Sequence, residues 1–236
     1  MRTGAFYSYY RDALIAGCGM CVSCKMVIKN AKYLISSPDF SKCPVPDRQE
    51  YAFIGRSNVG KSSLINMLCN NDKLAKTSNS PGKTQLINHF NITGSLNEKS
   101  GEESHWYLVD LPGYGFAKIS QSSRRRWEQM IENYLRKREN LLTVFVLLDS
   151  RHTPQKIDLE FLSKLQKWEV PFSLVFTKAD KSTQATVSKN VKLFLEAMKK
   201  TWQFLPRHFV TSAIKKMGRD KILAFIEETN NTNYTT

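Results

Sequence analysis

One eight-residue stretch constrains the fold of this chain more than any other part of it, Gly55-Arg56-Ser57-Asn58-Val59-Gly60-Lys61-Ser62. It matches G-x-x-x-x-G-K-[ST] at every position, with an apolar strand expected before it and a helix expected after it. Its glycines let the backbone turn its N–H groups inward, and the helix N-terminus adds partial positive charge. The stretch therefore predicts a phosphate-binding loop, in which Lys61 contacts the β- and γ-phosphates and the Ser62 hydroxyl binds Mg²⁺.

The rest of the chain alternates apolar runs with amphipathic segments. We expect strands at 51–54, 85–92, 105–109, 141–148, 172–176 and 204–210, and helices at 61–69, 122–138, 153–168, 183–200 and 218–228. Such alternation indicates βαβ units, with one antiparallel hairpin where two strands follow each other directly. The sequence therefore predicts an α/β fold with a mainly parallel six-stranded sheet and helices on both faces.

Two short motifs follow expected strands and indicate the base of a nucleotide. Thr177-Lys178-Ala179-Asp180 ends the strand at 172–176, where open α/β sheets bind ligands. A carboxylate only accepts hydrogen bonds, and guanine offers it two adjacent donors where adenine has a ring acceptor. Asp180 therefore predicts guanine, with the Lys178 stem over the base. Thr211-Ser212-Ala213 follows the last strand, and its backbone N–H groups are candidates for the guanine carbonyl oxygen.

Two further segments are candidates for the γ-phosphate side of the site. Asp110-Leu111-Pro112-Gly113 ends another buried strand, and Asp110 is placed to hold Mg²⁺ through water while the Gly113 N–H reaches the γ-phosphate. The loop Gly82-Lys83-Thr84-Gln85-Leu86 supplies Thr84 as a second hydroxyl ligand. The predicted metal ligands are thus Ser62, Thr84 and Asp110, and the candidate catalytic groups are Lys61, Thr84 and Gly113. Both segments would order around the γ-phosphate and relax after its loss.

The motifs GRSNVGKSS, PGKTQ, DLPGYGFAK, TKAD and TSA stand in this order along the chain. Together they resemble the Era-like GTPases, and most closely the EngB family of bacterial ribosome-biogenesis GTPases, over residues 26–228. The resemblance implies a Ras-like fold, GTP hydrolysis, a cytoplasmic location, and a role in assembly of the large ribosomal subunit that is linked to cell division and septation.

The residue after Gly113 bears on the rate of hydrolysis. Ras-type enzymes orient the attacking water with a Gln just after Asp-x-x-Gly, and this chain has Tyr114 there. We therefore expect slow intrinsic hydrolysis that a partner or a bound cation accelerates. In several Era-like relatives an Asn at the position of Asn58 helps to bind K⁺, so K⁺ is a candidate cation; the alternative is an ordinary polar loop residue.

The formal net charge of +14 favours a polyanionic partner. We favour nucleic acid over a mere solubility charge or an anionic membrane face, and by resemblance rRNA of the large subunit rather than DNA. We expect a monomer without stable membrane association. The alternatives are a GTP-gated rRNA-binding module with incidental turnover and a membrane-associated small GTPase. Basic residues cluster at Arg124-Arg125-Arg126, Arg136-Lys137-Arg138, Lys199-Lys200, and Lys215-Lys216 with Arg219.

Residues 1–25 lie outside the resemblance and show no folding pattern. They carry Cys18, Cys21 and Cys24, three of the five cysteines, without an obvious fourth ligand for a closed zinc site. A weak lipoprotein-like box at 15–18 is the other reading. We expect a disordered extension or a mis-assigned start, followed by a single GTPase domain at 26–236.

Overall fold

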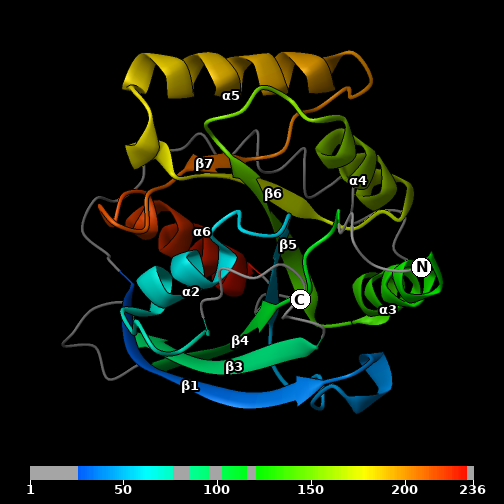
Figure 1. Cartoon of the computed structure of the whole chain (residues 1–236). Coiled ribbons are helices and arrows are strands. Elements are labelled where there is room, and N and C mark those ends of the chain that lie inside the picture. Colours follow the sequence, from blue (N-terminus) through cyan, green and yellow to red (C-terminus); the bar gives the residue numbers. More distant parts are fainter. Residues whose placement is uncertain (1–25, 77–85, 96–102, 116–120, 233–236) are drawn as a thin grey trace.

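The computed structural model describes residues 26–76, 86–95, 103–115 and 121–232. They form one twisted sheet between two layers of helices (Figure 1). The strands are β1 (Val27–Ser37), β2 (Glu50–Gly55), β3 (Ile87–Ser95), β4 (Glu103–Asp110), β5 (Leu141–Asp149), β6 (Phe172–Thr177) and β7 (His208–Val210). The helices are α2 (Lys61–Cys69), α3 (Gln121–Lys137), α4 (Lys156–Lys167), α5 (Gln184–Lys199) and α6 (Arg219–Thr232), with short 3₁₀ turns η1 (Phe40–Lys42) and η2 (Ala179–Lys181).

The sheet has the order β1-β3-β4-β2-β5-β6-β7. Neighbouring strands in the part of the sheet ordered β4-β2-β5-β6-β7 pair in parallel. Strand β3 pairs antiparallel to both β1 and β4. The predicted α/β class and the predicted hairpin are therefore confirmed. The carboxyl ends of β2, β4, β5, β6 and β7 all reach the same edge of the sheet, which is where ligands bind in such folds.

The prediction of six strands is wrong, because β1 adds a seventh at the edge of the sheet. Most of its side chains are exposed, including Tyr33 and Leu34, and its pairing with β3 is interrupted twice by register shifts. An exposed and irregular strand lacks the alternation of polar and apolar residues from which strands are predicted. The sequence pattern therefore does not predict a strand at Val27–Ser37.

Several predicted boundaries also moved. The last strand is confined to His208–Val210, and Phe204, at its predicted start, is 47 % exposed. Helix α4 starts at Lys156 rather than at 153, and α3 starts at Gln121 rather than at 122. Thr183 caps α5 through its side chain, which accepts from the Thr186 N–H.

Two apolar cores hold the layers together, one on each face of the sheet. Helices α3, α4 and α5 pack on one face and α2 and α6 on the other (Figure 1). Alternate residues of β5 serve the two cores: Val144 and Val146 face the first, and Phe145 and Leu147 face the second. A continuous apolar run, such as 141–148, is typical of a strand that is buried on both faces.

Candidate functional site

The predicted phosphate loop lies between the end of β2 and the start of α2. Gly60 caps α2 with φ +101°, a conformation that L side chains rarely adopt. A Cβ on Gly55 would come within 2.9 Å of Leu147, so the first glycine is required by close packing against β5. The Thr177 hydroxyl donates to the carbonyl oxygen of Val59 at 2.7 Å, and this bond ties the loop to the end of β6.

The end of β4 runs directly alongside this loop. The Lys61 ammonium contacts the Asp110 carboxylate, and both side chains are nearly buried. The Tyr114 N–H donates to the Gly55 carbonyl oxygen at 3.2 Å, and a Cβ on Gly113 would lie 2.6 Å from the same oxygen. The structure thus brings Lys61, Asp110 and Gly113 together as predicted, with Gly113 pressed against the loop.

The base end of the site lies where β6 and β7 end. The Ser212 hydroxyl donates to Asp180 Oδ1 at 2.6 Å, and this hydrogen bond is the main cause that lowers the pKa of Asp180. The carboxylate is therefore ionised at neutral pH and is 8 % exposed. An ionised carboxylate held in this way can accept both guanine donors, as the sequence predicts.

The three backbone amides predicted for the guanine oxygen are not equivalent. The Thr211 N–H donates to the Phe176 carbonyl at 2.7 Å, and the Ser212 N–H donates to the Met217 carbonyl at 3.2 Å. Both amides therefore have partners within the fold. This narrows the prediction to the N–H of Ala213, which follows them.

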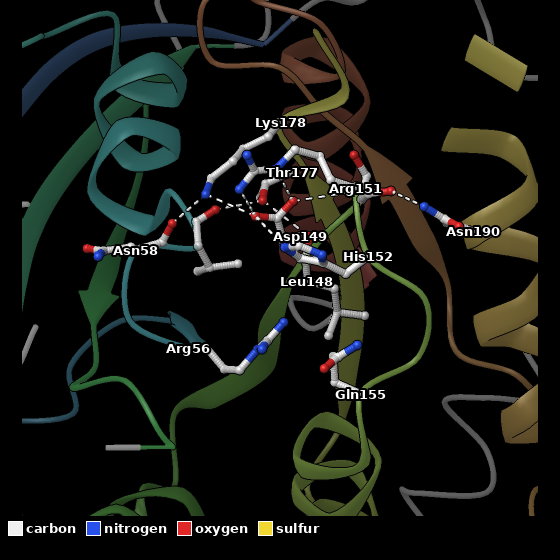
Figure 2. Close-up of polar contacts among 12 residues, drawn as sticks. Arg56, Asn58, Leu148, Asp149, Arg151, His152, Gln155, Thr177, Lys178 and Asn190 are labelled. Atoms are coloured by element: carbon white, nitrogen blue, oxygen red, sulfur yellow. Dashed lines mark hydrogen bonds and ion pairs between the residues drawn. The ribbon is translucent and has the colours of Figure 1, made fainter. Parts of the chain in front are cut away.

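Lys178 has contacts that the sequence did not predict. Its ammonium donates to the Asn58 carbonyl at 2.5 Å and to Asp149 Oδ2 at 3.0 Å, so it spans from β6 to the phosphate loop (Figure 2). Arg151 also binds Asp149, through Nε at 2.9 Å and a terminal nitrogen at 2.7 Å. Hydrogen bonds from these two cations outweigh burial and hold the pKa of Asp149 far below its usual range.

Asp149 is thus a site residue that sequence reasoning missed. It ends the apolar run of β5 just as Asp110 ends β4, so its position at the carboxyl end of a buried strand was the available signal. It orients Lys178, whose stem was predicted to lie over the base.

Tyr114 lies in the interior instead of facing the phosphate end. Its ring is 3 % exposed and stacks on Phe161 with ring centroids 4.3 Å apart. Its hydroxyl donates to Asp158 Oδ1 at 2.8 Å. A phenol in this position has no access to an attacking water, which agrees with the expectation drawn from its chemistry.

The residues at the phosphate end fit the way Mg²⁺ binds beside nucleotides. Ser62 supplies a hydroxyl oxygen and Asp110 a carboxylate, and Mg²⁺ prefers one or two such ligands together with phosphate oxygens and water. Across the described ranges, no group of three or more His, Cys, Asp or Glu side chains could hold a metal by itself. The fit therefore depends on the nucleotide to complete the ligand set.

Part of the predicted site lies outside the described residues: Gly82, Lys83, Thr84 and Gln85, as do Cys18, Cys21 and Cys24. Leu86 is described and is 39 % exposed. The role of Thr84 as a Mg²⁺ ligand therefore stays a prediction. No helix in the described part of the chain has both the length and the apolar character needed to cross a bilayer.

The residues of the predicted basic clusters differ in their exposure and in their contacts. Arg124, Arg125 and Arg126 are exposed on the first turns of α3. Arg138 belongs to a predicted cluster but is 4 % exposed and binds Glu50, so it is a core residue. Arg219 donates to backbone oxygens at the end of α2. The 124–126 cluster is therefore a better candidate for an external partner than 136–138.

Comparisons with known proteins agree on one family. The sequence model of a family described as 50S ribosome-binding GTPase matches residues 50–178. A probable GTP-binding protein EngB from Flavobacterium psychrophilum is 50 % identical over 87 % of this chain and 96 % of its own length. The corresponding protein of Porphyromonas gingivalis is 51 % identical over 87 % of this chain and 97 % of its own.

Solved structures show the same fold. A crystal structure of a probable GTP-binding protein engB superposes with a TM-score of 0.56 at 21 % identity, over 78 % of this chain and 99 % of that one. Era in complex with MgGDPNP and a segment of 16S ribosomal RNA gives a TM-score of 0.59 at 23 % identity, over 77 % of this chain and 56 % of that one.

Proposed function

The chain belongs to the EngB family of GTP-binding proteins and is a P-loop GTPase, and we propose that it acts as a slow, Mg²⁺-dependent switch in assembly of the large ribosomal subunit. The observation that carries guanine recognition is the ionised Asp180 carboxylate, which Ser212 holds at the carboxyl edge of the sheet. The ribosomal partner rests on the family description, "50S ribosome-binding GTPase", and on the net charge of +14. A cytoplasmic location and involvement in cell division follow from the same proposal.

Each side chain acts on a different part of the nucleotide. Asp180 selects guanine, and the Lys178 stem lies over the base while its ammonium binds the phosphate loop. Lys61 neutralises charge on the β- and γ-phosphates. Mg²⁺, when bound by Ser62 and Asp110, adds further positive charge at these phosphates. Because Lys61 contacts Asp110 in this structure, phosphate oxygens compete with that carboxylate for the ammonium.

Slow hydrolysis follows from the burial of Tyr114, which leaves no water-orienting side chain just after Gly113. A monovalent cation is then a candidate source of positive charge. The side chain of Asn58 points away from Asp149, while its backbone carbonyl accepts from Lys178 (Figure 2).

We expect GTP hydrolysis to be about tenfold faster in KCl than in NaCl at equal ionic strength, because K⁺ bound beside Asn58 would stabilise charge that develops on the leaving phosphate oxygen. Phosphate release under single-turnover conditions measures it. Asn58→Gly is the informative variant, since glycine tolerates the φ of +61° at this position and the substitution removes the whole Asn side chain with its amide. Equal rates in both salts, or an unchanged ratio in Asn58→Gly, would refute the K⁺ proposal.

Co-sedimentation with large ribosomal subunits tests the partner. We expect the protein to pellet with the subunits with a GTP analogue that cannot be hydrolysed, and to remain largely free with GDP. Replacing Arg124, Arg125 and Arg126 by Ala should weaken binding. It should also make the affinity depend less steeply on salt, with the negative slope of log affinity against log salt decreasing in magnitude by about 2. The matched control replaces Lys167 of α4 and Lys189 and Lys192 of α5, three exposed cations outside the predicted clusters, by Ala.

An equal loss in both triple variants would show that net charge rather than the 124–126 cluster makes the contact. Failure of the unmodified protein to bind in either nucleotide state would reject the ribosomal partner. Stimulation of GTP turnover by the subunits separates a true switch from a binding module whose turnover is incidental.

A further inference from the structure

Three segments that are far apart in the sequence meet at one buried carboxylate, Asp158, in the first turn of α4. The Tyr114 hydroxyl donates to its Oδ1 at 2.8 Å, and Arg56 Nε lies 3.2 Å from the same oxygen. Tyr114 directly follows Gly113, and Arg56 directly follows the first glycine of the phosphate loop. The triad of Arg56, Tyr114 and Asp158 thus links both phosphate-facing segments to α4.

Two members of the triad are buried, and burial raises the pKa of the Asp158 carboxyl while the Tyr114 hydrogen bond and the Arg56 charge oppose that shift. Asp158 is 2 % exposed and Tyr114 is 3 % exposed. Burial, together with the charge of Asp158, raises the pKa of Tyr114 far above its usual value, so the phenol remains a proton donor. Losing one partner of such a buried pair leaves a polar group without compensation. The hydrogen bond therefore restrains the Tyr114 side chain at Asp158.

Backbone hydrogen bonds hold the chain on both sides of Gly113. Before Gly113, the Leu111 N–H donates to the Phe53 carbonyl at 3.0 Å, and after it the Tyr114 N–H donates to the Gly55 carbonyl at 3.2 Å. Tyr114 also forms an isolated parallel bridge with Arg56, which extends the pairing of β2 and β4 into the site. Gly113 thus lies between the end of the β2–β4 pairing and the Arg56–Tyr114 bridge, and Tyr114 holds the far end of this stretch in place.

Gly115 is the last residue of this constrained segment, 111–115. Its φ is +82°, and a Cβ there would come within 2.8 Å of the Ile157 side chain on α4. The segment therefore packs closely against Ile157, next to Asp158, in the first turn of α4. A change in the Tyr114 contact would be transmitted to the position of the Gly113 amide, because the two residues are adjacent and the loop has little free space.

We propose that Tyr114 is a positioning residue for nucleotide discrimination: through Asp158 and Arg56 it holds the Gly113 N–H where it meets the γ-phosphate. The inference rests on the proposed binding of GTP at this site. Because GDP has no γ-phosphate, the triad contributes to the affinity for GTP and leaves that for GDP largely unchanged. The tyrosine at this position thereby contributes to recognition of GTP, whereas the Gln of Ras-type enzymes orients the attacking water.

The test compares two tyrosines that make the same buried bond in different places. Tyr114→Phe removes only the hydroxyl that binds Asp158. Tyr134→Phe is the matched control, because the Tyr134 hydroxyl donates to the buried carboxylate of Glu50 at 2.8 Å, at the opposite end of β2 from the phosphate loop. Affinities for GDP and for a non-hydrolysable GTP analogue are measured for the full-length chain by fluorescent-nucleotide titration, and apo stability by thermal unfolding.

We expect both variants to fold and to lose similar stability. Tyr114→Phe should bind the GTP analogue about tenfold more weakly while its GDP affinity changes less than about twofold, and Tyr134→Phe should leave both affinities unchanged. Equal losses for both nucleotides, or no loss, in Tyr114→Phe would overturn the inference. If the unmodified chain bound neither guanine nucleotide, the proposed function itself would fail, and the two failures are therefore distinguishable.

Discussion

Replacing Asp180 by Ala should weaken binding of GDP and of GTP by about 100- to 10,000-fold. The carboxylate would accept two hydrogen bonds from guanine, and bonds to a charged group contribute about 1.5–3 kcal/mol each. Removing it also leaves the Ser212 hydroxyl without its carboxylate partner. Isothermal titration of purified protein with each nucleotide measures the loss.

The control for this variant is Asp220→Ala, because Asp220 is an exposed acid on α6, and its carboxylate lies 3.8 Å from Arg219. It removes the same charge from the chain and should leave nucleotide affinity unchanged. Asp180→Asn adds a sharper readout. Its amide offers one donor in place of an acceptor, so the variant should prefer xanthine, which carries a carbonyl oxygen where guanine has its amino group. If Asp180→Ala still bound GDP tightly, the assignment of the base site would be wrong.

Replacing Glu50 by Ala should lower the free energy of unfolding by about 3–5 kcal/mol. Glu50 is fully buried at the start of β2 and binds Arg138 at 2.8 Å and 2.5 Å and the Tyr134 hydroxyl at 2.8 Å. His89 Nε2 lies 3.3 Å from it. Truncation leaves the Arg138 guanidinium buried without its counter-ion. Urea denaturation at pH 7 measures the difference, and the variant needs to be compared at equal nucleotide concentration.

The same carboxylate makes stability depend on acid. Hydrogen bonds and charge from Arg138, with His89 Nε2 lying 3.3 Å away, outweigh burial and lower the pKa of Glu50 from 4.5 to about 2. A carboxyl whose pKa is depressed by folding stabilises the protein above its unfolded pKa, and this contribution is lost as pH falls from about 4.5 to about 2. The unmodified protein should therefore lose more stability across this interval than Glu50→Ala does.

Glu132→Ala is the control for the loss of a carboxylate, because Glu132 pairs with Arg136 at 2.8 Å on the exposed surface of α3. Exposed pairs of this kind contribute only about 0.3–0.5 kcal/mol. A comparable effect of the two substitutions would contradict the view that burial of Arg138 is what makes the Glu50 pair important.

The sequence by itself determined the elements whose signals are local. The phosphate loop needs glycines at set positions between a strand and a helix, and Asp110 and Asp180 follow apolar runs that end at one edge of a parallel sheet. These signals lie within a few residues of the groups they describe. The α/β class, the hairpin and the doubly buried strand β5 could be predicted for the same reason. The first and last residues of the helices and strands were predicted less accurately.

Only the tertiary structure decided which side chains share a partner across long stretches of chain. Asp158 meets Tyr114 and Arg56, Asp149 meets Lys178, and Glu50 meets Arg138 because helices and strands pack at particular distances and angles. No local pattern records such distances. Strand β1 was missed on related grounds, since its pairing with β3 rather than its own sequence makes it a strand. The prediction that Tyr114 fails to orient water came from its chemistry, whereas its role as an anchor for Gly113 came from its neighbours in space.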